Sequence, residues 1–178
     1  ATIRLDGGDV MQGAAASNLT RGRAMVEVFN AMRVDAAAIG NHEFDWSIDT
    51  LAARIREARF AWLGANIRET ASRRRPGWAV PMTIVQAGTR RVAVVGYTTP
   101  GTVTSTNPDN VRRLGFLGAA ALDSAIAAAR AQRPDFVIVV AHEGAFCNNQ
   151  NVCQGGIVDL ANALTNRPDL IVSGHTHS

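Results

Sequence analysis

The sequence predicts an α/β fold built on a mixed β-sheet. Apolar, β-rich runs alternate with helical segments from residue 2 to residue 172, which is the pattern of strands joined by helices. Two of these runs, 80–86 and 91–97, are separated by a short segment containing Gly88, which indicates an antiparallel hairpin. We therefore expect parallel and antiparallel strands together.

The composition fits one soluble globular domain. The chain has 178 residues, of which 47% are hydrophobic, so it can bury a real core. No apolar run approaches the roughly 18 residues that cross a membrane, and we expect no membrane span. The 18 basic residues are all arginine and the net charge is +3, which mildly favours anionic ligands. The arginines form no dense stripe, so no nucleic acid polymer is expected as a partner.

The first part of the chain should hold three short strands and two helices. The strands are expected at 2–5, 36–39 and 60–63, and residues 10–20 are expected to be a loop. A helix over 21–33 is predicted by apolar residues spaced at three and four, namely Met25, Val28, Phe29 and Met32. The second helix should run from Ser47, its N-cap, to about residue 59.

The second part continues the alternation after the hairpin. Residues 98–115 contain two prolines and several Thr and Asn, and are expected to be a loop. Helices are expected at 119–132 and 157–164. Apolar strands should follow them at 136–141 and 170–172.

The only two cysteines, Cys147 and Cys153, flank five residues of loop character. The pairing favoured by this short spacing is a disulfide that closes a small surface loop. Two free thiols or a pair of soft-metal ligands are the alternatives.

Metal-ligand residue types gather where apolar strands end. They are Asp9, Asn41, His42, His142, His175 and His177, and they include all four histidines of the chain. Incidental histidines would be expected on helices too, so this placement favours a shared site. Carboxylate, amide and imidazole groups together suit Zn, Mn or Fe.

Four motif blocks occur in the order found in the calcineurin-like metallophosphoesterases. They read GDVMQG at 8–13, GNHEFD at 40–45, AHEG at 141–144 and GHTH at 174–177, and the segment VVGYTTP at 94–100 adds to the match. The chain is most similar to the bacterial 5′-nucleotidase branch of that superfamily. The resemblance spans the whole chain.

This resemblance implies an αββα sandwich of two mixed sheets flanked by helices, with two divalent metal ions at one edge. Asp9 would bridge the metals, Asn41, His142 and His175 would bind one of them, and His177 would bind the other. His42 would be the acid or phosphate stabiliser and Asp45 its orienter, although Asp45 could instead cap the following helix. Glu43 is assigned to the scaffold. The implied reaction is hydrolysis of phosphate esters, chiefly nucleotides, by a hydroxide that two metals activate.

The family pattern also contains parts that residues 1–178 do not show. We expect a catalytic domain truncated at both ends, lacking a first Asp-x-His strand and a C-terminal substrate-binding domain. A degenerate domain that binds metal or a phosphorylated ligand without turnover is therefore an alternative function, and a related sulfur-ester hydrolase is another. The cysteine pair and the family together favour a periplasmic or secreted bacterial protein.

Overall fold

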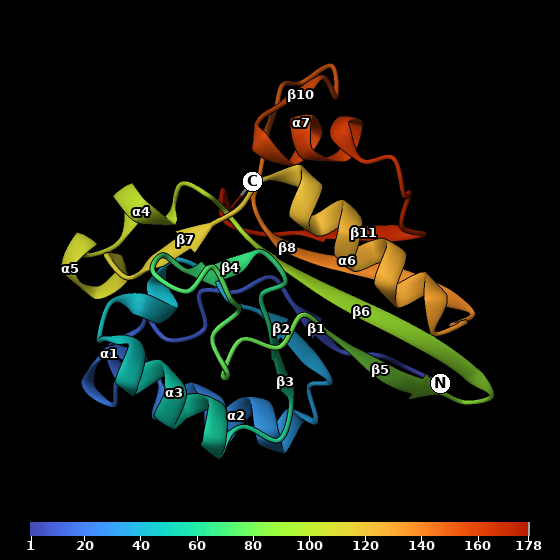
Figure 1. Ribbon diagram of the computed structural model, residues 1–178. Coiled ribbons are helices and arrows are strands. Elements are labelled where there is room, and N and C mark those ends of the chain that lie inside the picture. Colours follow the sequence, from blue (N-terminus) through green and yellow to red (C-terminus); the bar gives the residue numbers. More distant parts are fainter. Residues whose placement is uncertain (178) are drawn as a thin grey trace.

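The computed structural model describes residues 1–177 and shows four layers, with helices outside and two sheets packed between them (Figure 1). The first sheet is parallel, in the order β1 (Leu5–Asp6), β2 (Ala36–Ala38), β3 (Ala61–Leu63). The second is mixed, in the order β11 (Leu170–Ser173), β8 (Phe136–His142), β6 (Arg90–Thr98), β5 (Met82–Ala87). The expected αββα sandwich is confirmed.

The outer layers are formed by helices of 5 to 13 residues. On the first sheet lie α1 (Ala15–Leu19), α2 (Arg23–Met32) and α3 (Ile48–Glu57). On the second lie α6 (Ala119–Ala131) and α7 (Gly156–Ala163). The part of the chain that the structure describes contains no helix with the length and apolar character needed to cross a bilayer.

Three cores follow from the alternation of side chains along the strands. In β2, Ala37 faces the α2–α3 layer while Ala36 and Ala38 face the second sheet. In β6, Val92 and Val94 face the first sheet, whereas their neighbours face α6. This period of two is what a strand buried on both faces requires.

Short elements connect the layers. Two small antiparallel sheets pair β4 (Ile67–Glu69) with β7 (Leu114–Phe116), and β9 (Phe146–Cys147) with β10 (Cys153–Gln154). The other short elements are η1 (His42–Phe44), α4 (Thr102–Ser105) and α5 (Pro108–Val111). Cys147 and Cys153 form a disulfide that closes the β9–β10 hairpin, so the favoured pairing is confirmed.

Several sequence expectations were wrong in detail. Residues 10–20 are not all loop, because α1 forms there, anchored by a hydrogen bond from Ser17 Oγ to Val10 O. Residues 98–115 are likewise not one loop, since they hold α4, α5 and the start of β7. The first strand was expected at residues 2–5 but consists only of Leu5–Asp6. These elements are too short to produce a hydrophobic period.

The buried face of α2 also differs from the expected one. Val26 and Phe29 are buried, while Val28 and Met32 are 46% and 53% exposed. Apolar residues spaced at three and four form two adjacent stripes along α2. Packing against β2 and α3 buries the stripe that contains Val26.

Candidate metal centre

The candidate site lies at the carboxyl ends of four strands, where the two sheets meet. β1 and β2 lead to Asp9 and Asn41, and β8 and β11 lead to His142 and His175. The sheets approach closely here, because a Cβ on Gly7 would lie 3.2 Å from Gly174 Cα. Each sheet therefore supplies half of the donors.

Three nitrogen and oxygen donors converge on His142 Nε2. Asp9 Oδ2 lies 3.1 Å from it, Asn41 Oδ1 3.0 Å and His175 Nδ1 3.0 Å. Ligand atoms of Asp9, His142 and His175 all lie within 4.8 Å of one another. One carboxylate, one amide oxygen and two imidazoles form a donor set that fits a divalent cation of the Zn, Mn or Fe type.

Local contacts orient these donors. His142 Nδ1 lies 2.7 Å from the carbonyl oxygen of Gly7, which accepts its proton and directs Nε2 toward the other donors. Asn41 Nδ2 donates to Ser105 O at 2.9 Å, which turns Oδ1 toward His142. Ser105 belongs to α4, within the segment expected to be a plain loop.

The electrostatics couple His142 to Asp9. Burial favours a neutral His142 ring, but the hydrogen bond and charge of Asp9 outweigh it and raise the pKa of His142. Burial favours a neutral Asp9, but the hydrogen bond and charge of His142 outweigh it and hold the pKa of Asp9 below its ordinary value. Burial, followed by the charge of His142, lowers the pKa of His175, so its ring is neutral at neutral pH.

Glu43 joins the two loops of the first sheet. It is fully buried, and its carboxylate accepts hydrogen bonds from the backbone N–H groups of Asp9, Met11 and Gly40 at 2.9, 3.0 and 2.6 Å. Burial, with the charge of Asp9, raises the pKa of Glu43 to about 7. The scaffold assignment of Glu43 is confirmed by these contacts.

Left-handed backbone occurs at several site residues that are not glycine. The φ angles are 64° at Asp9, 77° at His175 and 55° at His177. Such angles are costly for residues with a Cβ and persist where the surroundings enforce them.

His42 and Asp45 form a contact beside the donor cluster. His42 Nδ1 lies 2.6 Å from Asp45 Oδ2, and the backbone N–H of His42 donates to Asp9 Oδ1 at 2.9 Å. Asp45 Oδ1 accepts from Thr106 Oγ1 at 2.7 Å, a partner that the sequence did not suggest. Asp45 does not cap α3, because Ser47 Oγ accepts from Thr50 N and fills that position.

His177 stands apart from the cluster. Its side chain is exposed, and it lines a cavity of about 360 Å³ together with His175 and the Cys147–Cys153 disulfide. The structure thus brings together Asp9, Asn41, His142 and His175 but leaves His177 outside, and the role of His177 as a ligand stays a prediction.

The family model described as "Bacterial capsule synthesis protein PGA_cap" matches residues 6–178. The chain belongs to the PGA_cap family. This PGA_cap chain is also similar to a 5′-nucleotidase of Vibrio cholerae, with 31% identity over 98% of this chain and 32% of the relative.

Solved structures of similar proteins share the fold of this chain. The 5′-nucleotidase precursor from Thermus thermophilus superposes with a TM-score of 0.81 at 30% identity, covering 99% of this chain and 32% of that one. The sulfate thiohydrolase SoxB of T. thermophilus gives 0.82 at 28% identity, covering 99% and 30%. The resemblance of this PGA_cap chain to the 5′-nucleotidase branch of the calcineurin-like metallophosphoesterases is confirmed. The chain spans about a third or less of the length of the curated relatives it matches.

Proposed function

We propose that residues 1–178 form the catalytic part of a metal-dependent phosphoric monoester hydrolase that acts on nucleotides. The observation that carries this proposal is the convergence of Asp9, Asn41, His142 and His175 directly beside the His42–Asp45 pair. The similarity to 5′-nucleotidases supports nucleotides as the substrate class.

Two divalent ions complete the proposed site. Asn41, His142 and His175 would hold one ion, His177 would hold the other, and Asp9 would touch both. When bound, such ions neutralise phosphate charge and lower the pKa of a water molecule to near neutrality. The donor cluster supports the first ion directly, whereas the second rests on the assignment of His177.

His42 acts on the substrate in this proposal. Asp45 accepts the proton on Nδ1, which directs Nε2 toward the phosphate ester. The side chain of His42 is 36% exposed, so a substrate can reach it. From that position the ring stabilises the phosphoryl group or gives a proton to the leaving oxygen. Thr106 holds Asp45 in place through its hydroxyl.

The test is hydrolysis of nucleoside monophosphates by the chain, and by any longer product of the same gene, with added Mn or Zn. We expect activity that EDTA removes and metal restores. His42→Ala should lower kcat by about 10²- to 10⁴-fold, the contribution of a positioned acid–base group, and Asp45→Asn by less. Arg56→Ala, an exposed change on α3, is the control. Full activity in His42→Ala would reject the assignment of His42.

A sulfur-ester hydrolase is the second candidate, favoured by the similarity to the sulfate thiohydrolase SoxB. Parallel assays with nucleotides and with S-sulfonated thiols separate the two reactions. Metal binding without turnover of either substrate would favour the degenerate binding domain instead.

We also propose a periplasmic or secreted location and a larger whole protein. The Cys147–Cys153 disulfide supports an oxidising compartment. Because the V. cholerae relative is about three times as long, we propose that recognition of the substrate's nucleoside at the metal centre uses residues outside these 178.

A further inference from the structure

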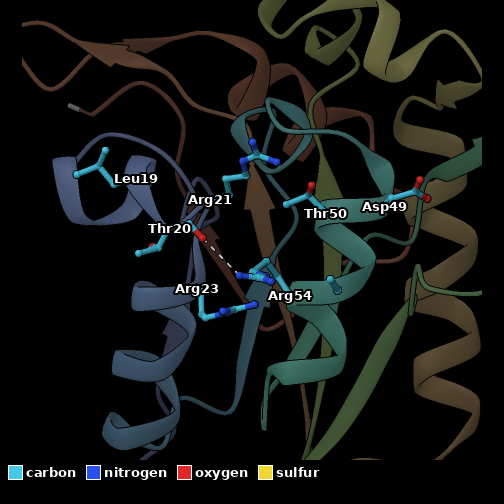
Figure 2. Close-up of a pocket in the computed structure, with 8 residues that line it drawn as sticks. Leu19, Thr20, Arg21, Arg23, Asp49, Thr50 and Arg54 are labelled. Atoms are coloured by element: carbon cyan, nitrogen blue, oxygen red, sulfur yellow. Dashed lines mark hydrogen bonds between the residues drawn. The ribbon is translucent and has the colours of Figure 1, made fainter.

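A second cavity lies between the turn that joins α1 to α2 and residues 49–54 of α3 (Figure 2). Its volume is about 580 Å³, and three arginines line it: Arg21, Arg23 and Arg54. None of its lining residues belongs to the candidate metal centre. The cavity is therefore a separate feature with its own chemistry.

Arg54 is the buried member of the three. Only 6% of the residue is exposed, yet its ordered contacts are few: Nη2 donates to Glu57 Oε1 at 3.0 Å and Nη1 to Thr20 O at 3.4 Å. Within residues 1–177, its buried Nε has no hydrogen-bond partner. A buried guanidinium normally finds acceptors for its five N–H groups, so the acceptors at this one are incomplete.

The two exposed arginines, Arg21 and Arg23, add positive charge that nearby carboxylates do not fully balance. Arg23 Nη2 lies 3.5 Å from Glu57 Oε1, the same oxygen that Arg54 uses. Arg21 forms no ion pair with any residue that the structure describes. Figure 2 shows Arg21 and Arg23 reaching from the turn and the start of α2 toward α3, on which Asp49 and Thr50 also line the cavity.

The turn that carries these arginines is held in a fixed shape. Arg21 has a left-handed backbone with φ of 49°, and Gly22 follows with φ of 82°. A Cβ on Gly22 would lie 2.5 Å from Met11 Cγ, so the turn packs directly on the loop that follows Asp9. Because the backbone is fixed, a bound ligand has to order only the side chains of Arg21 and Arg23.

We propose that this cavity binds a phosphate-type dianion, either free or as the phosphate group of a nucleotide. Guanidinium groups pair with phosphate oxygens through parallel N–H donors. The three arginines face two carboxylates, that of Glu57 and that of Asp49, which also lines the cavity, so a net positive charge remains for an anion. The site needs no metal and does not depend on the proposed hydrolase activity.

The test is isothermal titration calorimetry in EDTA, with inorganic phosphate and adenosine 5′-monophosphate as separate probes. We expect saturable binding to one site of the wild-type chain. The double variant Arg21→Gln/Arg23→Gln should bind at least 10-fold more weakly. The control Arg56→Gln/Arg59→Gln removes the same charge from exposed residues outside the cavity and should bind like wild type.

Each outcome decides a different point. Tighter binding of the monophosphate ester identifies a nucleotide ligand, and equal or tighter binding of phosphate identifies the free ion. His142→Ala disrupts the metal centre and should leave the affinity unchanged, which separates this site from the proposed active site. No binding by wild type, or equal weakening in both double variants, would overturn the proposal.

Discussion

Glu43 shows how much of the candidate site depends on one side chain that touches no substrate. Its carboxylate accepts three backbone N–H groups, two from the Asp9 loop and one from Gly40. These bonds fix Asp9 against the turn that carries Asn41. Donor positions in this site are therefore set by a residue outside the donor cluster.

Replacing Glu43 with Gln tests this role. The amide keeps the shape but presents an N–H₂ group to backbone donors, so at least one buried bond is lost. We expect a loss of about 1–3 kcal/mol in the free energy of unfolding and weaker Mn or Zn binding. Urea denaturation and calorimetry measure the two effects.

The exposed Glu27→Gln on α2 is the matched control and should change neither quantity. Unchanged metal affinity in Glu43→Gln would show that the Asp9 loop holds its shape without these bonds.

At the scale of elements, carboxylates fix where β8 begins. Asp135 accepts from Arg91 N and pairs with Arg90, while Asp169 accepts from Val137 N and pairs with Arg130. The hydrogen bond from Val137 is the largest cause that lowers the pKa of Asp169. These contacts set the register of β8 against β6 and β11, and hence the position of His142.

Asp169→Asn should make the stability of the chain less sensitive to acid. A carboxyl whose folded pKa is depressed stabilises above its unfolded pKa of about 3.9, and this contribution is lost as the pH falls through the folded value. The variant should be less stable by about 0.5 kcal/mol at pH 7, because solvent screens this exposed pair.

The difference in unfolding free energy between Asp169→Asn and wild type should shrink below about pH 4. Urea titrations at pH 7, 4 and 2.5 measure this difference. A difference that stays constant across this range would show that the charge of Asp169 is not involved.

The long elements were predictable from the sequence, but the short ones were not. The helices α3 and α6 and the strands β6 and β8 carry clear periods or apolar runs. The donors at the strand ends were also predictable, because the carboxyl ends of parallel strands lie at one edge of a sheet. By contrast, Ser105 and Thr106, which orient Asn41 and Asp45, come from short helices and turns fixed by tertiary contacts.

At the scale of the whole molecule, the site takes its donors from both sheets, which pack against each other through a shared middle core. Leu51 belongs to the core under α3, and Ile126 to the core under α6. The middle core, with Ala38, Leu63 and Val94, connects them. A chain packed in this way should unfold in one cooperative transition.

Leu51→Ala and Ile126→Ala test this cooperativity from opposite sides. Both side chains are fully buried, so each variant should lose about 2–5 kcal/mol of unfolding free energy. Tryptophan fluorescence and far-UV circular dichroism should shift together in both variants. Separate transitions for the two signals would show that the two outer layers unfold independently.

The left-handed backbone at Asp9 and His175 lowers the stability of the fold at positions that the proposed metal chemistry requires. Glycine adopts such angles without strain, whereas each of these residues costs about 1–2 kcal/mol there. His175→Gly should therefore melt at or above the wild-type temperature while it loses a metal donor, and differential scanning calorimetry would record this. A laboratory evolution experiment that selected for heat resistance alone would favour glycine at His175, where it would remove a metal donor while relieving the backbone, whereas Asp9 would be kept by its contacts with His42 and His142.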